Sequence, residues 1–236
     1  MEQRNRETLK PKTLKPPFKN IFFDVGNTLL FPNRDRILAP LHALGVEPSI
    51  DQLHDLERRT KRKFDQLVKD GNADRSFWWM FYTSLLEENS VENDQVRDQL
   101  VNATRQSANW DSILPGTREA LCGFAVKHRI GVISNADGKI KSVLATCNIA
   151  DCFLTITDSG LVGHEKPHPA IFQAAFREMN AHAEESLYVG DVYSVDYVGA
   201  TQAGMQAVLF DVAGTYRDQD LPRVESLQEL SERLWQ

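Results

Sequence analysis

Three chemically capable residues, Asp24, Ser134 and Asp191, each end a short apolar run, although they are far apart in the sequence. Two carboxylates brought together would repel each other, and one would tend to stay protonated unless a cation joined them. Mg²⁺ suits such a site because it binds a few carboxylates together with water and substrate phosphate. Lys166, at the expected start of a helix, could neutralise negative charge on a nucleophile and on a phosphate. These residue types therefore indicate metal-assisted chemistry on a phosphorylated compound.

Parallel strands in one sheet would bring these residues together. In open α/β sheets, ligands bind beyond the carboxyl ends of the strands, which is where Asp24, Ser134 and Asp191 are all expected. The alternation of strands and helices predicts a parallel sheet with right-handed crossovers and helices on both faces. The expected strands cover residues 20–24, 130–134, 153–157, 187–191 and 207–211, and the helices between them cover about 117–128, 140–144, 169–179 and 195–203.

Between residues 34 and 109 the hydrophobic pattern is helical only. We therefore predict a Rossmann-like α/β core domain made of residues 18–33 and 110–236, with an inserted all-helical domain at residues 34–109. Residues 1–17 are basic and contain three prolines, which predicts a flexible tail.

The composition argues against several classes of protein. The chain has 236 residues, a formal net charge of −6 and 42% hydrophobic residues, which is ordinary for a globular protein and predicts no nucleic-acid partner. No apolar run has the length needed to span a bilayer, so we expect no membrane partner. The three cysteines show no CxxC spacing, and a reducing, cytoplasmic location is the simplest explanation. We expect a monomer or a homodimer.

Four short motifs resemble those of the haloacid dehalogenase superfamily. In chain order they are Asp24-Val25-Gly26-Asn27-Thr28, Ser134-Asn135, Lys166-Pro167, and Gly190-Asp191 with Asp196 five residues after Asp191. Each motif alone is weak evidence, but their order and their strand contexts agree. The resemblance covers about residues 20–211. It implies a Mg²⁺-dependent hydrolase, most simply a phosphatase acting on a small phosphorylated metabolite, with a helical cap inserted after the first motif.

The resemblance also implies how the reaction would be carried out. Asp24 would attack phosphorus and form an aspartyl-phosphate that water then hydrolyses. Mg²⁺ would be held by Asp24, by the backbone carbonyl of Gly26 and by Asp191. Asp196 would support the metal from nearby or hold Lys166.

Phosphate binding is implied for the second and third motifs. Ser134 and the backbone N–H of Asn135 would bind phosphate oxygens, and Lys166 would balance negative charge as it develops. Thr28 would support the first motif.

Gly26 departs from the pattern of the superfamily's phosphatases. They usually have a second aspartate at this position, which protonates the leaving group and activates water. General acid–base help is typically worth about 10²–10⁴-fold. The sequence therefore predicts a slow enzyme, a substrate with a good leaving group, or another proton donor. His164, close to Lys166, and His42 and His54 in the predicted cap are candidates, although each is more simply explained as a surface histidine.

Two other branches of the superfamily also lack the second aspartate. Dehalogenases lack the metal-binding acids, so Asp191 and Asp196 argue against dehalogenation. Phosphonoacetaldehyde hydrolases use a cap lysine to form a Schiff base, and Lys61, Lys63 and Lys69 lie in the predicted cap; arginines around the first two favour a solvated helix face instead. A weakly catalytic member that binds a phosphorylated ligand or a protein stays open as a third alternative.

An aromatic run from Phe77 to Tyr82 is the most unusual part of the predicted cap. At helical spacing Trp78, Phe81 and Tyr82 share one face with Leu85. We expect these side chains to pack in the core of the cap, and contact with the substrate is the alternative.

Overall fold

The computed structural model describes residues 18–72 and 76–235, so the predicted tail at residues 1–17 lies outside the described residues. The main sheet is parallel throughout, which confirms the predicted α/β fold class. Its strand order is β5-β4-β1-β6-β7-β8, with β1 in an interior position. The strands are β1 (Asn20–Phe23), β4 (Arg129–Ser134), β5 (Thr155–Asp158), β6 (Ser186–Gly190), β7 (Gln206–Phe210) and β8 (Arg223–Val224).

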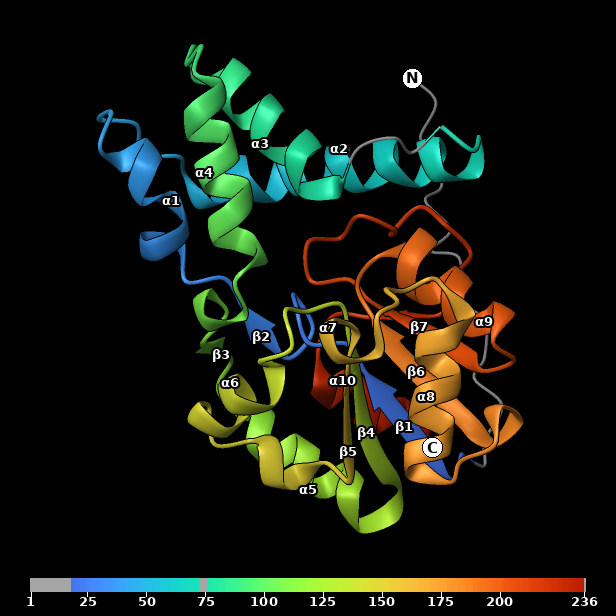
Figure 1. Ribbon diagram of the computed structural model, residues 1–236. Helices are drawn as coiled ribbons and strands as arrows, with labels where there is room; N and C mark the ends of the chain where they lie inside the picture. The colour runs from blue at the N-terminus through green and yellow to red at the C-terminus, as the bar shows by residue number, and fades with distance from the viewer. Residues whose placement is uncertain (1–17, 73–75, 236) are drawn as a thin grey trace, which may run out of the picture.

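Helices cover both faces of this sheet (Figure 1). Side chains alternate along β1, so Ile21 and Phe23 lie in the apolar cluster on one face and Phe22 lies in the cluster on the other. The first face is covered by α5 (Thr117–Lys127), α6 (Ile140–Thr146) and α10 (Leu227–Leu234); the second is covered by α8 (Pro169–Met179) and α9 (Val198–Gln202). Burial on both faces explains why the central strands read as continuous apolar runs.

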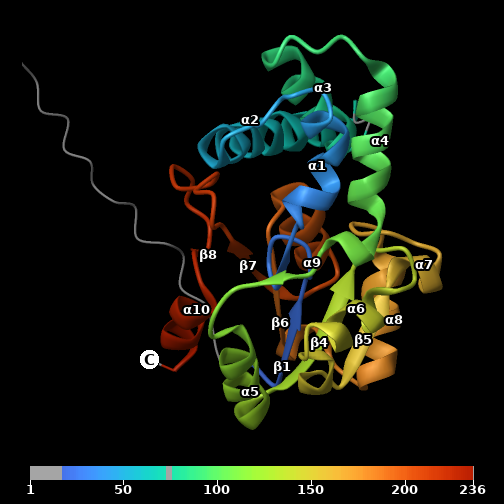
Figure 2. The same cartoon turned by 90° about the vertical axis from the view of Figure 1, so that its left-hand side faces the viewer.

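Four helices are inserted between β2 (Leu30–Phe31) and β3 (Ser112–Ile113), which form a small antiparallel pair. We call residues 34–105 the helical insertion. It has its own apolar cluster, in which Leu41, Leu85 and Leu100 are fully buried. Figures 1 and 2 show it beyond one end of the sheet, with α2 lying across that end. The helices are α1 (Arg34–His42), α2 (Ile50–Lys69), α3 (Phe77–Glu88) and α4 (Asp94–Arg105).

Capping residues fix where each helix of the insertion begins. Asn33, Ser49, Ser76 and Asn93 each accept a hydrogen bond from the backbone N–H three residues later. Such caps are each worth about 1 kcal/mol. The predicted aromatic face is present in α3, since the Trp78 ring contacts the rings of Phe81 and Tyr82.

The hydrophobic periodicity of the sequence does not predict the short elements of the fold. The two-residue strands β2, β3 and β8 carry too few residues for a pattern, and α10 lies beyond the last predicted strand. A single helix was expected at residues 195–203, whereas the structure has a π-helical turn, η4 (Tyr193–Tyr197), followed by α9. Other short elements are η1 (Ser107–Asn109), η2 (Ala150–Cys152), α7 (Ser159–Val162) and η3 (Ala183–Glu185). Among the described residues, no helix combines the length and the apolar character required to cross a membrane.

Candidate active site

Asp24 and Asp191 come together because their strands are neighbours. β1 pairs with β6, and the backbone N–H of Asp24 donates to the carbonyl of Val189 across that pair, at 2.8 Å. Asp196 joins them from η4, and one carboxylate oxygen from each of the three aspartates lies within 4.8 Å of the others. All three side chains are buried. The sheet edge therefore gathers the acids that the sequence singled out.

Lys166 links these acids. Its Nζ lies 2.6 Å from Oδ1 of Asp24, 2.8 Å from Oδ1 of Asp196 and 2.7 Å from the hydroxyl of Tyr188. The lysine is 5% exposed, so these contacts replace water. The second oxygen of Asp196 accepts the backbone N–H groups of Asp191 and Val192. Of the two roles expected for Asp196, holding Lys166 is the one that matches this geometry. We call Asp24, Lys166, Tyr188, Asp191 and Asp196 the Asp24 cluster.

Tyr188 is a member of the cluster that sequence reasoning missed. It lies within β6, where it was counted only as an apolar strand residue, and its hydroxyl donates to the carbonyl of Ile133 at 3.1 Å. A buried hydroxyl needs partners. A tyrosine inside a strand buried on both faces is therefore a signal that polar groups lie nearby.

The second motif contacts the third through a side chain rather than a backbone group. Asn135 Nδ2 donates to the carbonyl of Lys166 at 3.1 Å, and its Oδ1 accepts the backbone N–H of Lys166 at 2.7 Å. Ser134 is buried at the end of β4, next to β1. The phosphate-binding roles of Ser134 and Asn135 stay predictions. The two hydrogen bonds between the Asn135 side chain and the backbone of Lys166 show how Lys166 is positioned.

The first motif forms a tight loop after β1. Thr28 is buried, and among the described residues its hydroxyl has no hydrogen-bond partner. Gly26 faces the ring of Trp110: a Cβ placed on this glycine would lie 3.5 Å from the nearest ring carbon. The backbone carbonyl of Gly26 is retained, but no side chain is present to transfer a proton.

Lys61 lies in the site, and the expectation of a solvated lysine on α2 was wrong. Its Nζ is 2.7 Å from Oδ2 of Asp191 and 2.7 Å from Oε1 of Glu57, and the side chain is only 3% exposed. Burial lowers the pKa of Lys61, but the charges of Asp191 and Glu57 outweigh it and raise that pKa well above the ordinary value. The lysine is therefore an ammonium ion that joins the helical insertion to the Asp24 cluster.

The arginines around Lys61 are solvated, as expected, with side-chain exposures of 38% for Arg58, 53% for Arg59 and 48% for Arg62, but two of them also contact the core. Arg58 donates to the carbonyl of Ala213 at 3.2 Å, and Arg62 donates to the carbonyl of Thr215 at 2.8 Å. Arg59 pairs only within the insertion. Helical periodicity cannot distinguish a solvated charged face from one that meets a distant loop.

Negative charge exceeds positive charge in and around the cluster. Burial raises the pKa of Asp24 to about 7 against the opposing effect of Lys166, and it raises the pKa of Asp191 to about 6 against that of Lys61. Two ammonium groups, those of Lys61 and Lys166, face four carboxylates, those of Glu57, Asp24, Asp191 and Asp196.

A hard divalent cation fits this donor set. With all four carboxylates ionised, one Mg²⁺ would neutralise the excess of two negative charges, and carboxylate oxygens are its preferred protein ligands. Oδ2 of Asp24 and Oδ1 of Asp191 accept no hydrogen bond from the described residues, so they are available as ligands. Asp196 is less suited because both of its oxygens already accept hydrogen bonds.

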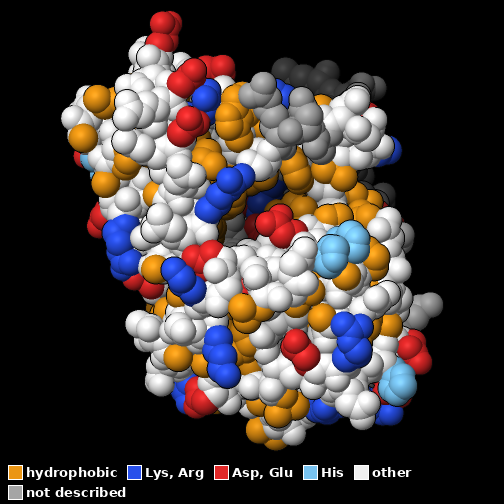
Figure 3. Space-filling view, viewed as in Figure 1, with side chains coloured by type: hydrophobic (Ala, Val, Ile, Leu, Met, Phe, Trp, Pro, Cys, Tyr) orange, Lys and Arg blue, Asp and Glu red, His pale blue; other side chains and the backbone are white. Residues whose placement is uncertain are grey.

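The three histidines considered as proton donors differ in position. His164 is exposed and stacks on His168, with ring centroids 4.2 Å apart, and the structure does not bring it into the Asp24 cluster. His42 pairs with Glu47 within the insertion. His54 alone of the three lines a pocket shared with Lys61. Figure 3 shows the surface hollowed between the insertion and the core, with charged side chains around the opening.

Several known proteins that resemble this chain in sequence or in fold are hydrolases or carry a hydrolase-like domain name. The haloacid dehalogenase-like hydrolase domain-containing protein 3 of Danio rerio is 26% identical over 235 residues, covering 93% of this chain and 96% of the relative. The glyceraldehyde 3-phosphate phosphatase of Methanothermobacter thermautotrophicus is 31% identical over 209 residues, covering 86% and 89%. The crystal structure of the magnesium-bound HAD-hydrolase YfnB from Bacillus subtilis has a TM-score of 0.70 at 17% identity, covering 93% of this chain and 99% of that one, and it shares the fold.

A model of one protein family also matches the sequence of this chain. Residues 18–204 match the description "Hydrolase: haloacid dehalogenase-like hydrolase", a span that includes all four motifs and the whole helical insertion. The sheet order, the gathered aspartates and this match agree, and the chain belongs to the haloacid dehalogenase-like hydrolases.

Proposed function

We propose that this protein is a Mg²⁺-dependent phosphatase that acts on a small phosphorylated metabolite through an aspartyl-phosphate at Asp24. The observation that carries the proposal is the contact of Lys166 with both Asp24 and Asp196, beside Asp191, at one sheet edge. Such a set can hold a nucleophile, a cation and a phosphate in one place. The phosphatase name of a relative that is 31% identical supports the same class of reaction.

The reaction proceeds in two steps at Asp24. A carboxylate oxygen of Asp24 attacks phosphorus, and the bond from phosphorus to the leaving oxygen breaks as the new one forms. The leaving oxygen keeps the electron pair and takes up a proton. Water then attacks the same phosphorus, which breaks the bond to Asp24, releases inorganic phosphate and restores the carboxylate.

Mg²⁺, bound by Asp24, Asp191 and the carbonyl of Gly26, would supply electrostatic stabilisation of the phosphoryl oxygens. Lys166 stays protonated beside Asp24: burial lowers its pKa, but Asp196 and Asp24 outweigh that effect and raise it. Its charge offsets the negative charge that develops on the phosphoryl group. Ser134 and the backbone N–H of Asn135 hold phosphate oxygens.

Gly26 shapes what the enzyme can hydrolyse quickly. Without an aspartate at this position, the leaving oxygen takes its proton from water or from another side chain, and His54 is the histidine that lines the neighbouring pocket. Esters of acidic alcohols and phenols need this help least, because their leaving groups are stable as anions. We therefore expect such esters to be the better substrates.

The cap consists of residues 34–109, which include the helical insertion, and the core consists of residues 18–33 and 110–236. Lys61 of α2 contacts Asp191, so closure of the cap brings a positive charge to the site and excludes water. A cytoplasmic location and a monomeric or homodimeric state remain predictions from the sequence.

The test is phosphate release with Mg²⁺ from a panel of phosphorylated metabolites. Asp24→Asn should lower turnover by about 10⁴-fold or more, because the amide cannot form the acyl-phosphate. Asp98→Asn, on an exposed part of α4, is the matched control and should keep full turnover. Turnover that survives Asp24→Asn, or no turnover of any compound by the wild type, contradicts the proposal.

One observation favours a second function, that of a phosphonoacetaldehyde-hydrolase-like enzyme. Lys61 is a cap lysine inside the site, as a Schiff-base lysine would be. Its ion pairs argue the other way, since an ammonium ion is not nucleophilic. Borohydride reduction with phosphonoacetaldehyde separates the two: a covalent adduct at Lys61 supports the second function, and an unmodified lysine supports the phosphatase.

A further inference from the structure

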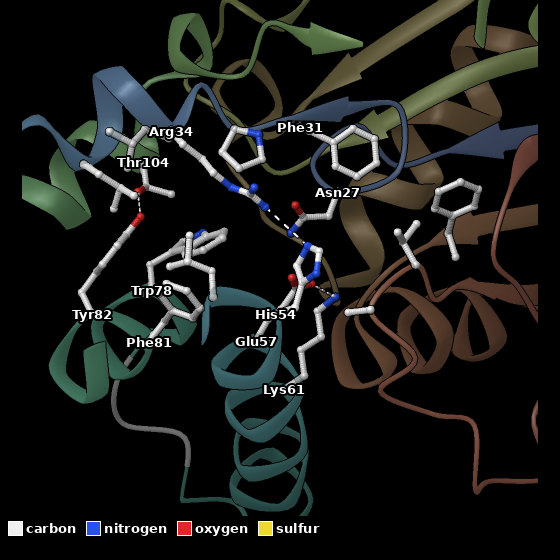
Figure 4. A pocket seen from close by; sticks show the side chains of 17 residues that line it. Asn27, Phe31, Arg34, His54, Glu57, Lys61, Trp78, Phe81, Tyr82 and Thr104 are labelled. Atoms are coloured by element: carbon white, nitrogen blue, oxygen red, sulfur yellow. Dashed lines mark hydrogen bonds and ion pairs between the residues drawn. The ribbon is translucent and has the colours of Figure 1, made fainter. Parts of the chain in front are cut away.

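A pocket lies between the helical insertion and the core, next to the Asp24 cluster. It reaches the cluster on two sides, because Lys61 contacts Asp191 and Asn27 belongs to the loop that follows Asp24. We call it the α3 pocket (Figure 4). Its lining residues come from the core (Asn27, Phe31, Pro32, Phe210, Val212, Ala213) and from the insertion (Arg34, Ile37, Leu38, Leu53, His54, Glu57, Lys61, Trp78, Phe81, Tyr82, Thr104).

Aromatic and aliphatic side chains form most of the wall. The rings of Trp78, Phe81 and Tyr82 contact one another, and the centroid of Trp78 lies 5.7 Å from that of Phe81 and 6.1 Å from that of Tyr82. The Tyr82 hydroxyl is already hydrogen-bonded to Thr104 at 2.5 Å. Apart from the indole N–H of Trp78, this wall thus offers mainly ring faces, which favours an apolar or aromatic part of a ligand.

Arg34 is the exception in this wall. Its guanidinium points toward His54, and the Nη2 to Nε2 distance is 3.4 Å (Figure 4). Among the described residues no carboxylate forms an ion pair with it. Glu57, the acid that lines the pocket, is occupied by Lys61. By contrast, Arg36 on the same helix is paired with Asp111.

The guanidinium of Arg34 can bind an anion in this setting. The side chain is half-buried among apolar groups, where a charge interacts more strongly than it does in bulk water. Partial removal of the guanidinium from water costs free energy, and a partner of opposite charge would offset that cost. A guanidinium can form two parallel hydrogen bonds with a carboxylate or a phosphate. The missing partner is therefore an anion that enters the pocket from outside.

We propose that Arg34 binds a second anionic group, carried by the leaving group of the substrate. The proposal rests on the phosphatase function and specifies its substrate class. That class consists of phosphate esters whose leaving group combines an apolar, ring-sized part with a carboxylate or a further phosphate. The ester phosphate lies at the Asp24 cluster, the apolar part lies against Trp78 and Phe81, and the second anion lies at Arg34.

This class differs from that of simple three-carbon sugar phosphates. A glyceraldehyde phosphate has no second anion for Arg34 and no apolar part for the rings of α3. An aryl phosphate with an acidic substituent satisfies both, and its phenolic oxygen leaves without the acid that Gly26 lacks.

Binding of three matched compounds to the Asp24→Asn protein with Mg²⁺ tests the proposal by calorimetry. The compounds are phenyl phosphate, 4-carboxyphenyl phosphate and benzene-1,4-diyl bisphosphate. We expect each of the two compounds with a second anionic group to bind about tenfold or more tightly than phenyl phosphate, as for a charge-assisted contact. Comparison of the carboxylate with the bisphosphate shows which anion Arg34 prefers.

Variants of Arg34 separate a direct contact from a general effect of charge. In Arg34→Gln the preference should fall to about twofold or less, whereas phenyl phosphate should bind as before, which shows that the pocket is intact. Arg34→Lys should keep part of the preference because the positive charge remains. Arg105→Gln, which removes an exposed arginine from α4, should keep all of it.

Equal binding of the three compounds to the parent protein would overturn the proposal, as would a preference that survives Arg34→Gln. Phosphate release by the wild-type protein is measured separately on the same compounds. A preference in binding without release of phosphate from these compounds or from the metabolite panel would refute the phosphatase function and leave the Arg34 site standing. Release of phosphate without a preference in binding would support the phosphatase function and refute the Arg34 site.

Discussion

The Asp24 cluster and the α3 pocket differ in how their charged groups are compensated. Each charged side chain of the cluster has a partner of opposite charge: Lys166 contacts Asp24 and Asp196, and Lys61 of the insertion contacts Asp191. In the pocket, Arg34 lies among rings and aliphatic groups without an acidic partner from the described residues. The first region is organised before any substrate arrives, whereas the second is completed by the substrate. Chemistry and substrate choice are thus supported by different physical means.

The largest effect is expected from breaking the cluster. Lys166→Met leaves Asp24 and Asp196 buried together without their shared cation. Removing one partner of a buried ion pair typically costs about 3–5 kcal/mol. We expect a loss of this size in the free energy of unfolding, measured with urea, and a loss of turnover of about 10³-fold. Lys141→Met, at an exposed position of α6, is the control, and comparable losses in both variants would contradict the special place of Lys166.

A smaller effect is expected at the boundary between the two regions. Lys61 neutralises part of the charge of Asp191 in the absence of metal. Lys61→Met should therefore tighten Mg²⁺ binding about tenfold, because a competing positive charge near the site is removed. Calorimetric titration of Mg²⁺ measures this directly. Unchanged or weaker Mg²⁺ binding would show that Lys61 and the metal do not compete for Asp191.

A still smaller effect is expected in the wall of the pocket. Tyr82→Phe removes the hydroxyl that contacts Thr104 while keeping the ring. Thr104 retains its hydrogen bond to the carbonyl of Leu100, so no buried group is left unsatisfied. We expect a loss of about 1 kcal/mol in the free energy of unfolding and little change in turnover. A large loss of turnover would mean that the hydroxyl, rather than the ring face, serves the substrate.

The smallest effect is expected at Gly26. A Cβ there makes ordinary contact with the Trp110 ring at 3.5 Å, and the backbone carbonyl is unchanged. Gly26→Ala should alter the free energy of unfolding by less than about 1 kcal/mol and turnover by less than about threefold. Thermal unfolding and phosphate release measure both. A severe loss would show that this loop needs glycine for a reason other than space.

Sequence reasoning predicted the parts that depend on local pattern. Apolar runs indicate the strands, and the rule that ligands bind beyond the carboxyl ends of parallel strands places Asp24 and Asp191 together from the sequence alone. Lys166 and Asp196 followed from the resemblance, and their mutual contact agrees with one of the two expected roles of Asp196.

The missed residues depend on packing between distant segments. Lys61 was taken for a solvated residue because its position on the helix gives no information about the core loop opposite. Tyr188 was taken for an ordinary strand residue because hydrophobicity scales do not record where a hydroxyl points. The sequence also could not show that Arg34 lacks an acidic partner among the described residues, because this depends on which side chains pack around it in the fold.

Trp110 has a consequence for spectroscopy. Its ring lies beside Gly26 and 5.6 Å from the ring of Trp78, which belongs to α3. Two indoles so close couple electronically, and the strength of that coupling depends on their separation and mutual angle, 61° here. The near-ultraviolet circular dichroism of the unlabelled protein should therefore report any shift of α3 against the loop that contains Gly26. These two native tryptophans thus provide an optical signal for any movement of the helical insertion.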